Sequence, residues 1–204
     1  MKIGILDLQG CVAEHIPHLK ALHVEVVRIR SESDLETIDG LIIPGGESST
    51  QLKLIDAFHL REALIKRASE IPFWGICAGA ILMAEKVTNP LQESLNLISI
   101  GAERNSYGRQ LESSVANLRN AQVALIRAPR LYVQSHSQVQ NLVIEDTHNG
   151  DAVHIRDSKT LHQVSSFHPE LSDTCPSPFH KEFVKVCSDC KIIKNKSSGL
   201  SQQI

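Results

Sequence analysis

The sequence predicts a single α/β domain, in which a mostly parallel sheet has helices on both faces and added antiparallel strands. Strand-like and helix-like segments alternate through the first half of the 204-residue chain, an order typical of parallel sheets. Short apolar runs separated by turn residues fill much of the second half, and these indicate antiparallel strands. Hydrophobic residues make up 42% and charged residues 22% of the chain, which is a globular composition.

The first part of the chain predicts two strands around a helix. An apolar run at residues 3–6 predicts a strand that ends at the turn formed by residues 7–10. Apolar residues then recur at helical spacing over 12–19, which predicts a helix. Segment 24–29 is rich in β-branched residues and follows at once, so we expect it to form a buried strand.

The next segments repeat this order. Residues 41–43 predict a third strand, which ends at residues 44–46 because a proline and two glycines interrupt regular structure there. Apolar residues at helical spacing over 60–68 predict a second amphipathic helix. Residues 72–76 are a fourth strand-like run directly before Cys77. This alternation indicates a largely parallel sheet.

The second half predicts strands of another kind. Four short apolar runs are separated by turn residues, and we expect them to form antiparallel strands added to the parallel core. These runs are residues 123–126, 142–144, 152–155 and 161–164. A final helix around 180–186 carries apolar residues on one face and should pack back on the core. We expect one domain over residues 1–190 and a polar tail, solvated or frayed, over 191–204.

The charge balance excludes some classes of partner. Lysine plus arginine total 21 against 23 for aspartate plus glutamate, which gives a net charge of −2 and an isoelectric point near 6.5. We therefore expect no binding of nucleic acid or of an anionic membrane, whereas small neutral or anionic metabolites remain open as ligands. No apolar run approaches the roughly 18 residues of a spanning helix, and the start of the chain does not resemble a secretion signal, so we expect a cytoplasmic protein.

The five cysteines are scattered along the chain and odd in number. A chain of this length can bury a core of its own, so a disulfide framework is unnecessary. Any cysteine with a special role is therefore expected to be a nucleophile or a ligand. Cys187 and Cys190 have a spacing found in zinc sites, but no second ligand pair accompanies them, and we favour an incidental spacing.

Residues 75–79, Gly-Ile-Cys-Ala-Gly, have the form in which a nucleophile is held on a strained turn between a strand and a helix. Strand-like residues precede Cys77 and good helix formers follow it, so the cysteine should lie at a helix N-terminus, where the helix dipole stabilises a thiolate. The alternative is a core cysteine between two packing glycines. These five residues alone do not decide between the two interpretations.

A thiolate nucleophile needs a proton carrier, and His168-Pro169-Glu170 supplies one. Pro169 restricts His168 to an extended conformation, in which residues two apart project to the same side. Glu170 could then fix the tautomer and orientation of the imidazole, as the third member of a nucleophile, base and orienter triad. The other nine histidines are expected to be surface residues or core residues with satisfied hydrogen bonds.

The third motif is Pro-Gly-Gly-Glu-Ser-Ser-Thr at residues 44–50, at the end of the third predicted strand. A Gly-Gly loop at this place can turn backbone N–H groups toward a developing oxyanion, and Glu47 would face the same crevice. The alternative is a plain turn in which Ser48 or Ser49 caps the following helix. Both interpretations can hold together.

These three motifs, in this order, resemble the class I (triad) glutamine amidotransferases. More specifically, the chain resembles the glutaminase subunits of pyridoxal 5′-phosphate synthase from residue 2 to about residue 186. The segments that carry this resemblance are Gly4-Ile5-Leu6-Asp7-Leu8-Gln9-Gly10 with Glu14-His15, Pro44-Gly45-Gly46-Glu47-Ser48, Glu103-Arg104-Asn105-Ser106-Tyr107-Gly108-Arg109-Gln110, Ile126-Arg127-Ala128-Pro129 and Ser166-Phe167-His168-Pro169-Glu170-Leu171. The resemblance implies the three-layer, flavodoxin-like fold of that class.

The resemblance also implies roles for particular residues. Cys77 would be the nucleophile, His168 the general base and acid, and Glu170 its orienter. The backbone N–H groups of Gly46 and Ala78 would form the oxyanion hole. The residues that would hold glutamine are Gly46, Glu47, Ser48, Arg104, Ile126 and Arg127. Independently of any family, arginines suit the α-carboxylate of the substrate and a carboxylate suits its α-ammonium group.

The function implied is hydrolysis of L-glutamine to L-glutamate and ammonia through a cysteine thioester, without a metal or an organic cofactor. The ammonia would pass to a (β/α)₈-barrel synthase subunit for vitamin B6 biosynthesis. One alternative is the glutaminase subunit of another pathway, such as imidazole glycerol phosphate synthase, which should lack segments 103–110 and 126–129. A stand-alone cysteine hydrolase is a second alternative. A non-catalytic binding module is a third, and the intact triad argues against it.

The chain departs from the usual family pattern at four positions, none of them in the triad. Asp7 replaces a small residue, Cys11 an alanine, Trp74 an aliphatic residue and Ile76 a threonine. Asp7 and Cys11 lie around the first turn, which in the resembled family faces the synthase partner. The details of that interface are therefore expected to differ here.

Overall fold

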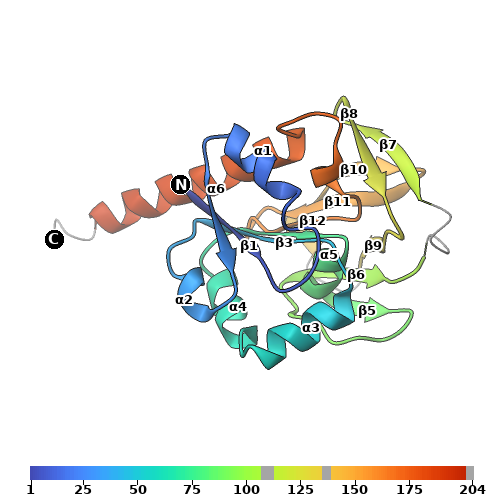
Figure 1. Ribbon diagram of the computed structural model, residues 1–204, viewed down its shortest axis with the longest axis horizontal. Coiled ribbons are helices and arrows are strands. Elements are labelled where there is room, and N and C mark those ends of the chain that lie inside the picture. The colour runs from blue at the N-terminus through green and yellow to red at the C-terminus, as the bar shows by residue number, and fades with distance from the viewer. Residues whose placement is uncertain (107–112, 135–138, 201–204) are drawn as a thin grey trace.

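A mixed ten-stranded sheet runs through the middle of the protein (Figure 1). The computed structural model describes residues 1–106, 113–134 and 139–200, with the backbone alone at 139 and 196–200. The strand order is β2-β1-β3-β4-β12-β11-β9-β6-β5, and β10 pairs with β11. The strands of this sheet are β1 (Lys2–Leu6), β2 (Glu25–Ile29), β3 (Gly40–Ile43), β4 (Phe73–Ile76), β5 (Ala84–Thr88), β6 (Ile98–Glu103), β9 (Arg130–Val133), β10 (Leu142–His148), β11 (Asp151–Asp157) and β12 (Gln163–Ser165).

The first five strands of this order form a parallel block, because β1 pairs in parallel with β2 and β3, and β4 with β3 and β12. Antiparallel pairs join β12, β11, β9 and β6, and β10 adds to β11. A separate hairpin consists of β7 (Ser114–Leu118) and β8 (Ala121–Leu125). The predicted fold class, a mostly parallel sheet with added antiparallel strands, is confirmed.

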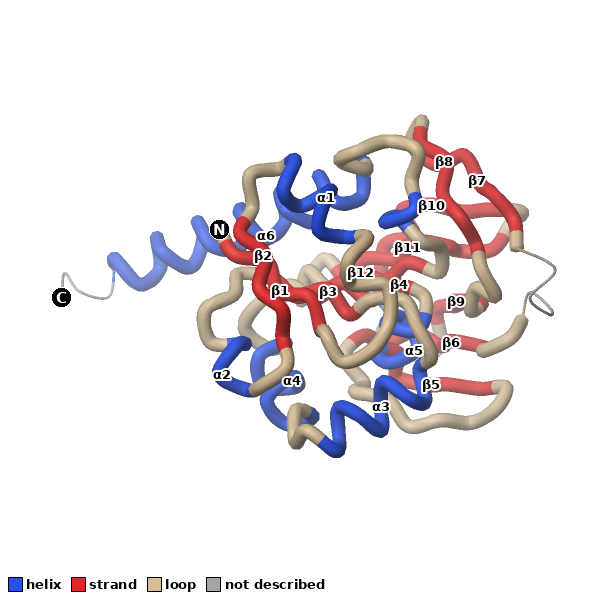
Figure 2. The backbone as a smooth tube through the Cα atoms, in the orientation of Figure 1, coloured by secondary structure: helices blue, strands red, loops and turns tan. Residues whose placement is uncertain are grey.

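Helices cover both faces of the sheet (Figure 2). The helices are α1 (His15–Ala21), α2 (Glu32–Leu35), α3 (Ser48–Ala57), α4 (Arg61–Ala68), α5 (Ala78–Met83) and α6 (Pro178–Leu200), with short 3₁₀ turns at Val139–Asn141 and Pro169–Leu171. One apolar core joins the sheet to α2, α3, α4 and α5, and the other joins it to α1, α6 and the β7–β8 hairpin. Successive residues of β3 enter opposite cores, as expected of a central strand.

Two predictions about individual elements were wrong. Segment 24–29 is an edge strand in which only Ile29 is fully buried, because β2 pairs on one side alone. Segment 161–164 contributes to β12, which lies in the parallel block beside β4 and is antiparallel only to β11. In the tail, α6 continues past residue 190 as far as Leu200.

The part of α6 beyond residue 190 extends away from the body of the protein (Figure 1). Residues 191–195 are exposed, so this segment is solvated as predicted, and it is helical. Lysine and isoleucine in this stretch are compatible with a helix, and no proline interrupts it. The division of the chain at residue 190 stays a prediction. Within the described residues, no helix is both long enough and apolar enough to cross a membrane.

Candidate active site

The three predicted motifs follow three neighbouring parallel strands. The loop at residues 44–47 follows β3, Cys77 follows β4, and His168 comes shortly after β12. Since β3 pairs with β4 and β4 with β12, all in parallel, their carboxyl ends meet at one edge of the sheet. Ligands of open parallel sheets bind at this edge.

Cys77 lies on a strained turn between β4 and α5. Its backbone has φ 49° and ψ −102°, a conformation that non-glycine residues rarely adopt. A Cβ atom on Gly75 would lie 2.6 Å from the carbonyl oxygen of Gly79, and one on Gly79 would collide with the carbonyl oxygen of Ile43. The flanking glycines therefore permit the close packing that the turn requires. Cys77 is 8% exposed and lines a cavity, so it is not a plain core cysteine.

His168 and Glu170 form a buried pair. The Nδ1 atom of His168 lies 2.6 Å from Oε1 of Glu170, with both side chains almost fully buried. His168 is extended, as Pro169 predicted. Glu170, however, lies in the 3₁₀ turn Pro169–Leu171, so this turn brings the two side chains together, and the expected extended spacing does not.

The charge on His168 is set by its partners. Burial lowers the pKa of the imidazole, but pairing with the Cys77 thiol and the Glu170 carboxylate raises it more, to about 10. Burial alone would raise the pKa of Glu170, and the hydrogen bond from His168 together with the nearby His15 lowers it below its ordinary value. The site therefore favours an imidazolium beside an ionised carboxylate.

The Gly45–Gly46 peptide is held by the first loop of the chain. The carbonyl oxygen of Gly45 accepts a hydrogen bond from the Cys11 N–H at 3.0 Å. The Gly46 N–H therefore points to the opposite side of the same peptide plane. Gln9 fixes the next peptide, because its Oε1 atom accepts from the Glu47 N–H at 3.0 Å.

Glu47, and not a serine, caps α3. Its carboxylate accepts hydrogen bonds from the backbone N–H groups of Ser49 and Thr50, at 3.1 and 2.7 Å. The prediction that Ser48 or Ser49 caps this helix was wrong, and the Ser48 hydroxyl instead donates to Gln92 at 2.9 Å. Burial alone would raise the pKa of Glu47. The hydrogen bonds from Thr50 and Ser49 outweigh this effect and lower the pKa to about 2. Glu47 is therefore ionised at neutral pH.

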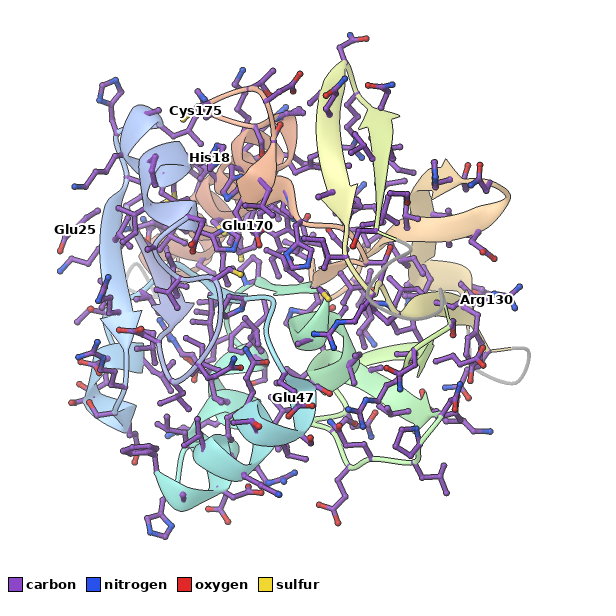
Figure 3. The ribbon with its side chains drawn as sticks, turned by 45° about the vertical axis from the view of Figure 1, so that its right-hand side comes forward. His18, Glu25, Glu47, Arg130, Glu170 and Cys175 are labelled. Carbon is purple, nitrogen blue, oxygen red and sulfur yellow. The ribbon has the colours of Figure 1, made fainter. Side chains whose placement is uncertain are left out.

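A cavity of about 110 Å³ opens beside Cys77. Its lining includes all the predicted glutamine-binding residues, namely Gly46, Glu47, Ser48, Arg104, Ile126 and Arg127, together with Cys77 and Ala78. Arg104 forms an ion pair with Glu47 at 3.2 Å. Figure 3 shows Glu47 at the start of α3 and Glu170 among the interior side chains. Residues 107–110 of the segment 103–110 lie outside the described residues.

Some residues of the site were missed from the sequence. Asn105 and Ile81 also line the cavity. Asn105 is next to Arg104, so the motif itself was a signal for it. Gln51 was a further omission, since its Nε2 atom donates to the carbonyl oxygens of Gln9 and Pro44 and ties the two loops together. Only the folded chain reveals this contact, because the loops are about forty residues apart in sequence.

Among the described residues, one group of side chains has ligand atoms close enough for a metal ion, with atoms of Cys11, His168 and Glu170 within 4.8 Å of one another. The His168 and Glu170 atoms of the 2.6 Å hydrogen bond are too close to ligate one zinc ion. Tetrahedral zinc ligands lie about 3.3 Å apart. This group therefore fits a hydrogen-bonded pair better than a metal centre. The expected absence of a metal or cofactor stays a prediction.

Comparisons with known proteins agree with this arrangement. The family model of the SNO glutamine amidotransferase family matches residues 5–189. The pyridoxal 5′-phosphate synthase subunit PdxT of Thermotoga neapolitana is 38% identical over 181 residues, covering 85% of this chain and 93% of that protein. The PdxT subunit of Solibacter usitatus is 40% identical over 184 residues, with coverage of 84% and 93%.

A crystal structure of a glutamine amidotransferase has the same fold and is related in sequence. It superposes with a TM-score of 0.79 at 30% identity, covering 91% of this chain and 98% of that one. The family match, the identity to these relatives and the shared fold together cover most of the chain. This chain belongs to the SNO glutamine amidotransferase family.

Proposed function

We propose that the protein hydrolyses L-glutamine to L-glutamate and ammonia at Cys77 and supplies the ammonia to the synthase subunit that makes pyridoxal 5′-phosphate. The observation that carries this proposal is the position of Cys77. Its strained turn lies at a cavity lined by two arginines and a carboxylate. Its thiol also raises the pKa of His168, and His168 is hydrogen bonded to Glu170.

The first half of the reaction forms a thioester. Because His168 Nδ1 is bonded to Glu170, Nε2 is the nitrogen that faces the thiol, and it takes the proton of Cys77. The thiolate attacks the carboxamide carbon, and the oxyanion that forms accepts hydrogen bonds from the Gly46 and Ala78 N–H groups. When the intermediate collapses, the C–N bond breaks, and the imidazolium gives its proton to the leaving nitrogen as ammonia departs.

The second half releases glutamate. Neutral His168 takes a proton from water, and the resulting hydroxide attacks the γ-glutamyl thioester. The C–S bond breaks and the Cys77 thiolate leaves beside the imidazolium, which restores the starting ion pair. Glu170 stays ionised throughout and stabilises the imidazolium in both halves.

The cavity provides recognition of the amino acid end of glutamine. Arg104 and Arg127 are suited to its α-carboxylate, because guanidinium groups donate in a planar fork. Glu47 is suited to the α-ammonium group. The Ser48 hydroxyl is engaged with Gln92, so Ser48 would contribute its backbone. Ile126 would shield the carbon chain of the substrate.

The names of the relatives support one ammonia acceptor. The relatives at 35–40% identity carry the name of a pyridoxal 5′-phosphate synthase subunit, so a (β/α)₈-barrel synthase subunit is the proposed partner. The alternatives of an imidazole glycerol phosphate synthase subunit and a stand-alone cysteine hydrolase receive no support from these relatives. The cytoplasmic location expected from the sequence stays a prediction.

The test uses two nitrogen sources. The protein is mixed with the synthase subunit, a pentose phosphate and a triose phosphate, and pyridoxal 5′-phosphate is measured with glutamine or with an ammonium salt. We expect glutamine to work only when this chain is present with an intact Cys77, and the ammonium salt to work without the chain. Product formation from glutamine by the Cys77→Ala variant, or none with the wild type, would contradict the proposal.

A further inference from the structure

Three buried histidines pack behind the Glu170 carboxylate. His15 and His18 belong to α1, and His180 belongs to α6. His15 and His180 have no exposed surface, and His18 is 4% exposed. The rings of His18 and His180 stack with centroids 4.4 Å apart. The proposed mechanism gives none of these three residues a role.

Two polar atoms of this region lack partners and face each other. Oε1 of Glu170 bonds His168, whereas Oε2 is buried and has no hydrogen-bond partner among the described residues. Nε2 of His15 is likewise buried without such a partner. These two atoms lie 3.8 Å apart. Because buried polar groups in folded proteins are nearly always paired, this juxtaposition needs an explanation.

A chain of hydrogen bonds continues from His15 away from Glu170. The Nδ1 atom of His15 lies 2.8 Å from Nε2 of His180, and Nδ1 of His180 lies 2.6 Å from the Ser177 hydroxyl. The Ser177 oxygen also accepts from the backbone N–H of His180 at 3.3 Å. The three side chains therefore form one line that ends at Oε2 of Glu170.

The direction of the protons along this line can be decided. If Ser177 donates to His180 and His180 donates to His15, then His15 carries its proton on Nε2 and presents an N–H to the carboxylate. In the opposite direction His15 would present a lone pair to Glu170, which is repulsive, and the Ser177 hydroxyl would lose its acceptor in this line. The first direction gives every acceptor of the line a donor and directs the His15 N–H toward Oε2 of Glu170, 3.8 Å away.

Both rings must be neutral for this arrangement, because a doubly protonated ring could not accept a hydrogen bond. Burial lowers the pKa of His15 to about 4, against the opposing effect of Glu170 and, more weakly, Glu14. Neighbouring His18 and His168 lower it further. Burial, followed by the nearby His15 and His18, also lowers the pKa of His180 well below its ordinary value. At neutral pH each ring therefore carries one proton.

We propose that His15 is a positioning residue for the triad, which directs its Nε2–H at Glu170 Oε2 across 3.8 Å and is itself held in that tautomer by His180 and Ser177. Glu170 is thereby fixed with Oε1 toward His168 in the orientation that the reaction needs. This inference rests on the proposed function, since it assigns His15 to the triad of that reaction.

Two substitutions of His15 separate positioning from packing. In His15→Gln the side-chain amide nitrogen lies near the place of Nε2 and can still donate to Glu170, whereas in His15→Asn it lies near the place of Nδ1 and cannot. We expect His15→Asn to lower kcat for glutamine roughly tenfold, with the synthase subunit present and KM little changed. His15→Gln should recover most of that loss.

A second readout does not depend on turnover or on the partner. The rate of Cys77 alkylation by chloroacetamide, followed by mass spectrometry of the Cys77 peptide at a series of pH values, reports the formation of its thiolate. A loosened Glu170 supports the His168 imidazolium less well, so the pH profile of His15→Asn should move upward, whereas that of His15→Gln should stay near the wild type. His162→Asn is the matched control, a buried histidine whose Nδ1 atom accepts from the Phe73 N–H and which does not line the cavity. It should leave the profile unchanged.

The positioning role is overturned if His15→Asn leaves kcat and the alkylation profile unchanged. It is also overturned if His15→Gln and His15→Asn lose activity equally while their thermal stability falls in parallel, because that pattern indicates packing alone. Failure of the proposed function has a different signature, namely no glutamine-dependent activity in the wild type. The alkylation profile would still test the contact between His15 and Glu170 in that case.

Discussion

Gly45 and His168 approach each other so closely that a Cβ atom on Gly45 would lie 2.5 Å from Cε1 of the imidazole. The His168 ring is buried and bonded to Glu170, so it has little freedom to move away. We therefore predict that Gly45→Ala displaces the imidazole and lowers kcat for glutamine roughly a hundredfold, the usual effect of a misplacement of about 1 Å.

The control for this substitution is Gly40→Ala. A Cβ atom on Gly40 would collide with the Cys187 sulfur, between β3 and α6, and Gly40 does not line the cavity. Both variants should lose stability by about 1 to 3 kcal/mol from overpacking. Only Gly45→Ala should lose kcat in addition, as measured by ammonia release with the synthase subunit present. Equal kcat values in the two variants would contradict the prediction.

Cys77→Ala should abolish ammonia release, by at least about a thousandfold, and leave the fold intact. Alanine is smaller than cysteine and tolerates the φ of 49° no worse than cysteine does. Circular dichroism and a thermal melt check the fold, and a coupled glutamate assay checks the activity. Substantial glutaminase activity in this variant would show that the nucleophile is another residue.

The two other triad members should differ in their effects. His168→Asn removes the group that moves the proton, whereas Glu170→Gln removes only the charge that orients it. We expect the kcat of Glu170→Gln to remain roughly a hundredfold higher than the kcat of His168→Asn. Equal and small losses would point to another base. The structure makes His162 and His180 poor candidates for that role, since both are buried and neither lines the cavity.

Much of the fold could be predicted from local pattern. Runs such as residues 41–43 are apolar and end at clear turn signals, so the parallel core was predictable. The position of β2 at the edge was not, because the β-branched residues of a strand do not reveal whether a second neighbour pairs with it. Strands β5, β6, β7 and β9 were also missed, since their short segments mix polar and apolar residues.

The site could be predicted where the residues that act together are also close together in sequence. Cys77 between its two glycines and His168 beside Glu170 are local signals of this kind. The contact of His15 with Glu170 joins residues 155 positions apart, at 3.8 Å, and no local pattern indicates it. The helix cap was misassigned because serine is the commoner cap, whereas here the longer Glu47 side chain reaches both N–H groups.

The buried histidines predict a loss of stability in mild acid. The pKa values of His15, His154 and His162 are lowered by burial to about 4, 3 and 4. The unfolded chain binds protons near pH 6.5 and the folded chain does not, so the free energy of unfolding falls as the pH drops from about 6.5 toward 4. Each such histidine contributes about 2 kcal/mol between pH 7 and pH 5.

His168 acts in the opposite direction at higher pH, because its raised pKa adds stability as the pH falls from about 10 to about 6.5, and this gain is fully present and constant below pH 6.5. The histidine effect can be isolated with His162→Gln, which removes one of the buried groups. Between pH 7 and pH 5 the free energy of unfolding, measured in denaturant, should decrease in both proteins. The decrease should be smaller in His162→Gln than in the wild type, by about 2 kcal/mol. Identical changes in the two proteins would show that His162 is not buried in its neutral form.

The last prediction concerns dependence on the synthase partner. The peptide between Gly45 and Gly46 presents its N–H to one side and its carbonyl oxygen to the other, and the hydrogen bond from Cys11 holds that carbonyl. Two glycines let such a peptide plane turn at little cost, so the oxyanion hole can be gained or lost by a local change. The loop of residues 9–11, which holds this peptide, overlaps the first turn of the chain at residues 7–10, and the family resemblance leads us to expect that this turn faces the partner.

An ammonia-producing subunit that worked alone would waste glutamine, so we expect weak activity in the isolated chain. Docking of the synthase subunit should fix the Gly45–Gly46 peptide and raise turnover mainly through kcat, because the oxyanion hole stabilises the transition state more than the bound substrate. Gln9→Ala loosens the loop by removing the acceptor for the Glu47 N–H, so it should weaken this activation. The measurement is steady-state ammonia release with and without the partner. Full activity of the isolated chain, unchanged on mixing, would contradict this dependence on the partner and favour a stand-alone cysteine hydrolase.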